Sequence, residues 1–137
     1  MARVLIVDDE PDILLMLRVN LETEGYETSL AADGEKALQR ISEDLPDIVL
    51  LDVMMPVMDG WGVLNALKGI DSPPPVVVVS AKSSDRDVAA ALSLGAVAFI
   101  TKPFDPHQLL DEVDRVLSST PDELEANRLT TIQRCGG

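Results

Sequence analysis

The stretch that decides the fold is PPPVVVVS, residues 73–80. Three prolines in a row cannot continue a helix, and the four β-branched valines that follow favour an extended strand. No polar residue alternates with the valines, so both faces of this strand are expected to be buried. A strand of that kind belongs inside a parallel sheet with helices packed on each side.

The rest of the chain repeats this pattern of a short apolar run followed by an amphipathic stretch. Further strands are predicted at residues 4–7, 28–31, 47–51 and 97–100. Helices are predicted at residues 11–24, after Asp33-Gly34, at residues 60–67, from Ser84 to Gly95, and from Pro106 through Leu117. The predicted fold class is therefore α/β, with a five-stranded parallel sheet and helices on both faces.

The chain has 137 residues, which is the usual length of one domain. We expect that domain to span residues 2–118 and residues 119–137 to form a C-terminal tail. Thr120-Pro121-Asp122-Glu123 could begin a helix, but the apolar pattern after it is thin. The tail is thus predicted to be a short helix, a linker stub or disordered.

Composition excludes several classes of protein. The 24 acidic residues against 11 lysines and arginines give a net charge of −13, which argues against a broad basic surface for nucleic acid or membranes. A single cysteine, Cys135, rules out a disulfide framework. No apolar run approaches the roughly 20 residues of a membrane span. The run at residues 4–7 is too short for a signal peptide and ends in acids, so we expect a cytoplasmic protein.

Chemically capable residues stand where the predicted strands end. Asp8 and Asp9 follow the first strand and Asp52 the third, while Ser80 and Lys102 end or follow the last two. Ligands of open α/β sheets bind at this carboxyl edge. If the first and third strands are neighbours, the carboxylates converge and need a cation, for which Mg²⁺ is the economical choice. Together with a lysine and a hydroxyl, they are the parts of a phosphoryl-binding site.

Four short motifs at these strand ends resemble the receiver domain of bacterial two-component response regulators, and the resemblance covers residues 2–118. They are Asp8-Asp9-Glu10-Pro11, Asp52-x-x-Met-Pro-x-Met-Asp59-Gly60, Ser80-Ala81 and Lys102-Pro103-Phe104. The resemblance implies a flavodoxin-like sheet with strand order 2-1-3-4-5. It also implies a cis peptide bond between Lys102 and Pro103.

The resemblance implies a role for each site residue. Asp52 would accept a phosphoryl group from a phosphohistidine of a sensor histidine kinase or phosphotransfer protein. Asp9 and Asp52 would bind Mg²⁺ through their side chains, Asp8 mainly through water, and Met54 through its backbone carbonyl. Lys102 would pair with the phosphoryl oxygens.

Two more residues would transmit the signal. Ser80 would donate a hydrogen bond to the phosphoryl group, and Phe99 matches the aromatic switch position that swings inward when Ser80 moves. The surface formed by residues 81–94, residues 97–104 and the last helix would then change its packing and bind a partner protein. Relatives often carry Thr at the position of Ser80, and Ser80 keeps the hydroxyl group. They often carry Tyr at the position of Phe99, and Phe99 lacks the hydroxyl group.

Each of these residues also has a purely structural interpretation. Asp8-Asp9-Glu10 could be a solvated loop, Ser80 a polar strand end, Lys102 a surface lysine and Phe99 a core residue.

Two other functions, a phosphohydrolase and a cofactor carrier, need residues that this chain lacks. A Mg²⁺-dependent phosphohydrolase would need a second Asp two residues after the nucleophile, where this chain has Met54, so we expect no turnover of outside substrates. A flavodoxin-like carrier would need a Ser/Thr/Gly-rich loop in place of Asp8-Asp9-Glu10.

The leading hypothesis is a stand-alone receiver that acts through protein contacts. We expect it to bind neither nucleic acid nor membranes directly. A receiver fragment of a larger regulator, for example one with a DNA-binding domain, and a phosphorylation-independent pseudo-receiver stay open.

Overall fold

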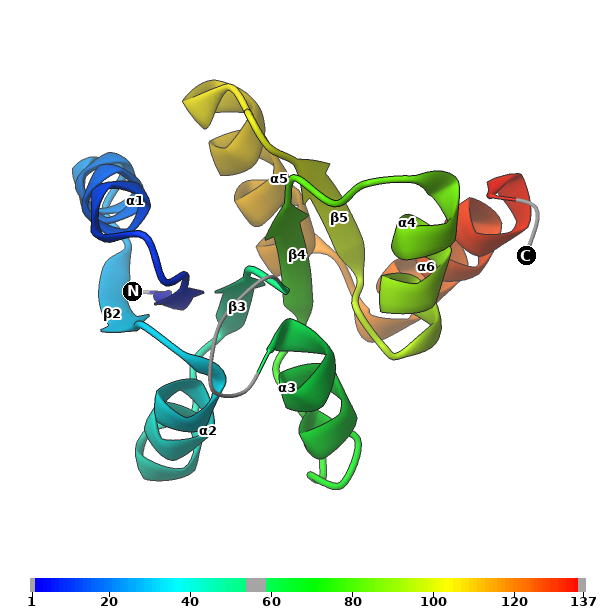
Figure 1. Cartoon of the computed structure of the whole chain (residues 1–137), viewed down its shortest axis with the longest axis horizontal. Coiled ribbons are helices and arrows are strands. Elements are labelled where there is room, and N and C mark those ends of the chain that lie inside the picture. Colours follow the sequence, from blue (N-terminus) through cyan, green and yellow to red (C-terminus); the bar gives the residue numbers. More distant parts are fainter. Residues whose placement is uncertain (1, 54–58, 136–137) are drawn as a thin grey trace.

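A parallel sheet of five strands runs through the middle of the protein (Figure 1). The computed structural model describes residues 2–53 and 59–135. Along the chain the elements are β1 (Arg3–Val7), α1 (Pro11–Thr23), β2 (Glu27–Ala31), α2 (Gly34–Glu43), β3 (Ile48–Leu51), α3 (Gly60–Leu67), β4 (Val76–Ser80), α4 (Asp85–Ser93), β5 (Ala98–Thr101), α5 (Pro106–Ser118) and α6 (Pro121–Arg134).

The strand order is β2-β1-β3-β4-β5, and every neighbouring pair is parallel. This confirms the predicted α/β fold class and the order that the resemblance implied. β1 and β3 are neighbours, and Val7 at the end of β1 pairs with Leu51 at the end of β3. β1 and β3 therefore end side by side at the carboxyl edge of the sheet.

Apolar layers lie on both faces of the sheet. The β4 valines Val77 and Val79 pack into the layer that α1 and α5 cover, whereas Val76 and Val78 pack into the layer that α2, α3 and α4 cover. All four valines are buried. The burial of both faces, predicted from the valine run, is confirmed, and it explains why an uninterrupted apolar run forms a strand here.

The helix ends follow the signals in the sequence. Asp33, Asp59 and Asp105 cap α2, α3 and α5 by accepting backbone hydrogen bonds, and Ser84 forms a capping box with Asp87 at α4. Gly95, just after α4, has a φ of 114°, a left-handed conformation that favours glycine.

The tail forms a helix, α6, which is one of the three predicted states. Thr120 and Glu123 make a reciprocal capping box at its start. Leu124 is buried in the layer of α1 and α5, whereas Ile132 packs against the layer of α2, α3 and α4. Leu129 faces solvent. The helix thus reaches from one apolar layer to the other around the β5 edge. The predicted boundary between the domain and the tail at residue 118 stays a prediction.

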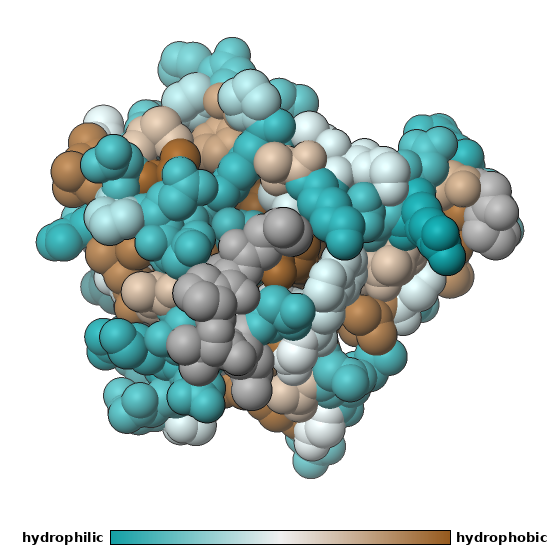
Figure 2. All heavy atoms as spheres, in the orientation of Figure 1, coloured by the Kyte–Doolittle hydropathy of each residue, from teal (hydrophilic) through white to brown (hydrophobic). Residues whose placement is uncertain are grey.

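Hydrophilic side chains cover most of the surface seen in Figure 2, with hydrophobic ones scattered among them. Within the described residues, no helix combines the length and the apolar character needed to cross a membrane.

Candidate functional site

The sheet itself positions the candidate residues. Hydrogen bonding continues one residue beyond three of the strands: the backbone N–H of Asp8 donates to Ala31 at 3.1 Å, that of Asp52 to Val7 at 2.9 Å, and that of Lys102 to Ser80 at 3.0 Å. These bonds hold the start of each loop in register with the neighbouring strand. The three side chains are therefore presented at one edge by the most rigid part of the fold.

Polar groups are buried at this edge. Asp8 is 2 % exposed, Asp52 4 % and Ser80 0 %, and they are the buried polar or charged residues within residues 2–53 and 59–135. Burying a carboxylate without a partner is costly, so aspartates are seldom buried without a functional or structural reason. The burial removes the interpretation of Asp8 as part of a solvated loop.

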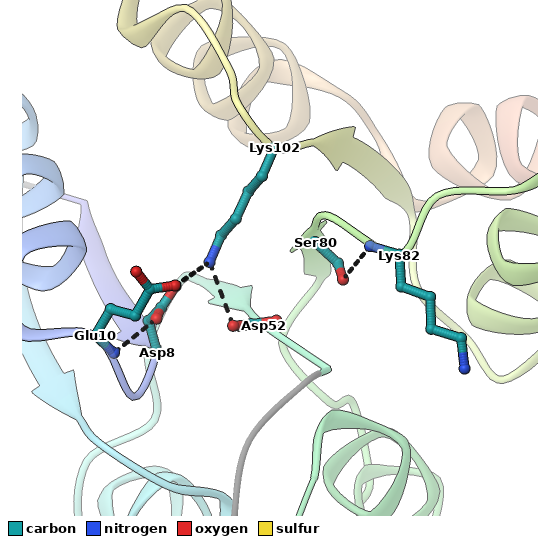
Figure 3. A network of polar contacts seen from close by, with 6 residues as sticks. All are labelled: Asp8, Glu10, Asp52, Ser80, Lys82 and Lys102. Carbon is teal, nitrogen blue, oxygen red and sulfur yellow. Dashed lines mark hydrogen bonds and ion pairs between the residues drawn. The ribbon is translucent and has the colours of Figure 1, made fainter.

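Lys102 lies between the two buried carboxylates (Figure 3). Its Nζ is 2.7 Å from Oδ2 of Asp8 and 3.3 Å from Oδ2 of Asp52, with Oε1 of Glu10 at 3.7 Å. Burial lowers the pKa of Lys102, but the hydrogen bond and charge of Asp8 and the charge of Asp52 outweigh burial and raise it. The ammonium therefore stays charged and supplies one cation that the converging carboxylates need. Its side chain is only 13 % exposed and pairs with two buried carboxylates, which excludes the interpretation of an ordinary surface lysine.

A group of carboxylates suited to a metal ion lies beside this network. Asp8, Asp9 and Glu10 each offer an oxygen within 4.8 Å of the others, with Asp9 and Glu10 exposed. The backbone N–H of Glu10 donates to Oδ1 of Asp8 at 2.9 Å, which fixes the turn. Several carboxylate oxygens close together fit a hard divalent cation such as Mg²⁺. Asp52 as a direct ligand stays a prediction, and Met54 lies outside the described residues.

The sequence alone assigns no role to Glu10. Its carboxylate belongs to the acidic group and lies within ion-pair distance of Lys102. The signal that could have shown this is its place directly after two acids at a strand end.

Ser80 ends β4 on the side of Asp52 away from Asp8 in Figure 3. Its Oγ accepts a hydrogen bond from the backbone N–H of Lys82 at 3.1 Å. A hydroxyl keeps a donor hydrogen when its oxygen accepts. The residue thus ties the site to the loop that leads into α4.

Phe99 is half-buried in the edge strand β5, where it pairs with Val78 and packs against the layer of α2, α3 and α4. Its position fits both the core and the switch interpretation.

Two backbone features shape the edge. The peptide bond between Lys102 and Pro103 is cis, as the resemblance implied. A Cβ added to Gly60 would lie 2.5 Å from Cα of Val53 and 2.8 Å from the carbonyl oxygen of Asp52. Glycine is therefore required where α3 begins beneath the Asp52 backbone. The sequence alone indicates the cap at Asp59-Gly60 but not this close approach.

Comparisons with known proteins show which family this chain resembles. The family described as response regulator receiver domain matches residues 4–114. The transcriptional regulatory protein PrrA of Mycobacterium leprae is 44 % identical over 115 residues, which are 84 % of this chain and 49 % of PrrA. The DNA-binding response regulator MtrA of Mycolicibacterium smegmatis is 40 % identical over 121 residues, 88 % of this chain and 53 % of MtrA. The chain spans about half the length of these curated relatives.

Solved structures show the same likeness. The crystal structure of a CheY-like response regulator receiver domain protein from Methanospirillum hungatei superposes with a TM-score of 0.81 at 32 % identity. The superposition covers 92 % of this chain and 98 % of the other.

Proposed function

The chain belongs to the response regulator receiver family, whose members are signalling proteins, and on that premise we propose that it is a phosphoacceptor of a two-component system. Asp52 is the acceptor. The observation that carries this proposal is the position of its buried carboxylate, with Lys102 Nζ at 3.3 Å.

The transfer balances as a displacement at phosphorus. An Oδ of Asp52 attacks a phosphohistidine, so an O–P bond forms while the N–P bond breaks and the electron pair stays on the imidazole nitrogen. Lys102 balances negative charge on the phosphoryl oxygens, and the Ser80 hydroxyl donates to one of them. The carboxyl edge of the sheet holds all three groups before the donor arrives, which favours the reaction by orientation.

A divalent cation fits this site. Asp9 and Asp52 would hold Mg²⁺ through their side chains, Asp8 through water, and the carbonyl of Met54 would complete the protein ligands. When bound, the ion supplies positive charge for the carboxylates and the phosphoryl oxygens. Asp8 and Glu10 keep Lys102 at the same edge, within reach of both the carboxylates and the phosphoryl group.

The signal leaves the site through Ser80. When its hydroxyl turns toward the phosphoryl group, the Lys82 backbone bonded to Ser80 moves with it. Two residues later, Ser84 and Asp87 form the capping box of α4, so the displacement reaches the α4 N-terminus. Phe99 fills the space that Ser80 leaves, and the surface of α4, β5 and α5 changes its packing for partner binding.

The donor is a sensor histidine kinase or phosphotransfer protein. A hollow of about 380 Å³ lies directly beside Lys102, with Ile13, Met16 and Phe104 in its wall. On α1, Leu15 and Val19 are exposed large apolar residues one helical turn apart. Exposed apolar residues on α1 suit contact with a protein partner.

The chain spans only part of the length of these relatives, and this favours a second form of the proposal. PrrA and MtrA are described as transcriptional and DNA-binding regulators, so this receiver would be the regulatory part of a longer regulator. In either form the chain turns over no outside substrate, hydrolyses its own phosphoaspartate and acts in the cytoplasm.

The decisive experiment is phosphorylation by acetyl phosphate with Mg²⁺, followed by intact mass measurement. We expect the wild type to gain one phosphoryl group and Asp52→Asn to gain none. Asp71→Asn, which alters an exposed acid outside the site, is the matched control and is expected to behave as wild type. No gain in the wild type, or an equal gain in Asp52→Asn, would refute the proposal and favour a pseudo-receiver.

A further inference from the structure

Helix α6 lies against the surface through which the proposed signal leaves. It packs on α4, at the side of the sheet where β5 is the edge strand (Figure 1). A groove of about 460 Å³ runs between α6 and β5, with Phe99 and Thr101 on the strand side and Thr130 and Thr131 on the α6 side. The α4–β5 surface, defined here by Val88, Leu92, Phe99 and Thr101, lines this groove, and α6 occupies the α4 side of it.

Three residues at spacings of four attach α6. Leu124 is buried, Ile132 packs against the apolar layer that includes Leu92, and Arg128 lies between them. Nη1 of Arg128 donates to the carbonyl of Leu92 at 2.7 Å. That carbonyl belongs to the last turn of α4, where the helix dipole attracts a cation. Glu125 pairs with the same guanidinium on the helix surface.

This attachment is shallow. α5 buries Leu109, Leu110, Val113 and Val116, whereas α6, of almost equal length, buries Leu124. A helix with little buried apolar surface belongs to the parts of a fold that open most readily. The cover can therefore leave while the domain stays folded.

We propose that α6 is a releasable cover of the α4–β5 surface, which occupies it in the unphosphorylated chain and leaves it when Asp52 is phosphorylated. This inference rests on the proposed function for its trigger. The partner that replaces α6 is an amphipathic helix of similar chemistry, with aliphatic residues eight positions apart and an arginine midway. Such a helix would take the place of α6 beside this groove and bind the same α4 carbonyl.

The trigger and the cover meet at Phe99. Phe99 and Ile132 pack against one apolar layer, and Phe99 also lines the groove beneath α6. A displacement of Phe99 toward Ser80, together with movement of α4 from its N-terminus, removes the surface on which Ile132 and Arg128 rest. Packed interfaces respond to such changes by separating rather than by gradual deformation.

Hydrogen exchange measured by mass spectrometry tests the cover first without phosphorylation. In Arg128→Ala/Ile132→Ala we expect amides of α6 and of residues 97–101 to exchange about tenfold faster, because a charged hydrogen bond and a partly buried aliphatic contact are lost. Leu129→Ala, on the exposed side of the same helix, should match the wild type. Amides of β1 and β3 report whether the fold is intact. Unchanged exchange in the double variant would overturn the inference.

The second measurement adds acetyl phosphate and Mg²⁺ and records intact mass beside hydrogen exchange. We expect the wild type to gain a phosphoryl group and α6 to exchange about tenfold faster, with neither change in Asp52→Asn. A mass gain with α6 still protected overturns the release and leaves the proposed function standing. No mass gain refutes the proposed function and with it the trigger.

Discussion

Lys102 at the carboxyl edge of the sheet and Arg128 on α6 are both cations withdrawn from solvent, with side chains 13 % and 18 % exposed. Their surroundings differ. Lys102 contacts the buried carboxylates of Asp8 and Asp52, whereas Arg128 contacts a backbone carbonyl and the half-exposed carboxylate of Glu125.

The difference separates a permanent part of the fold from a removable one. Without Lys102, two buried carboxylates lose their cation in a medium of low dielectric, and the folded state is destabilised. Without Arg128, one carbonyl loses a donor while Glu125 is solvated by water. The first contact is part of the domain's stability, and the second can be broken and remade at small cost.

The largest expected effect comes from Lys102→Met. We expect the free energy of unfolding to fall by about 3–5 kcal/mol, because the buried carboxylates of Asp8 and Asp52 lose the ammonium group that compensates their charge. Urea unfolding measures this fall, and added Mg²⁺ should restore part of it. Lys68→Met, at an exposed lysine, is the control. If the free energy of unfolding falls equally little in both variants, the network does not stabilise the fold.

The pH dependence of unfolding sharpens the same point. The pKa of Lys102 is raised above 10.5 in the folded protein, so its contribution is complete below pH 10.5 and is lost as pH rises through the higher folded value. We expect the difference in stability between wild type and Lys102→Met to shrink above pH 10.5. A constant difference would show that the lysine charge is not the cause.

A smaller effect is expected from Arg128→Ala, about 1 kcal/mol in urea unfolding, since one charge-assisted hydrogen bond is lost. The matched control is Arg18→Ala on α1. Arg18 pairs with Glu22 at 2.9 Å one turn away, a local ion pair comparable to that of Arg128 with Glu125. Because exposed pairs of this kind contribute only about 0.3–0.5 kcal/mol, the free energy of unfolding should fall less in the control than in Arg128→Ala. Equal losses would mean that the bond to Leu92 contributes nothing.

The smallest effect is expected from Glu125→Gln. The hydrogen bond from Arg128 lowers the pKa of Glu125, yet the carboxylate is exposed and water replaces its partner. The urea midpoint should match that of the wild type at neutral pH. A clear loss would show that the pair on α6, rather than the bond to α4, holds the helix in place.

Most of the fold and much of the site could be predicted because their signals are local. An uninterrupted valine run requires burial on both faces, and Ser84 with Asp87 satisfies amides within one turn. Asp8 and Asp52 follow apolar strands, so a parallel sheet necessarily brings them to one edge. The requirement for Gly60 depends on the close approach of Val53 and Asp52, which lie outside α3. Nothing in the local sequence reveals that contact.

The sequence by itself determined the alternation of strands and helices, the caps and the order of polar residues at the strand ends, because hydrophobic periodicity and capping act over a few residues. Only the tertiary structure decided that Lys102 lies between Asp8 and Asp52 and that α6 covers α4. Lys102 is 50 residues from Asp52 in the chain, and Arg128 is 36 from Leu92. Such contacts depend on where separate elements meet in space, which the pattern within each element does not specify.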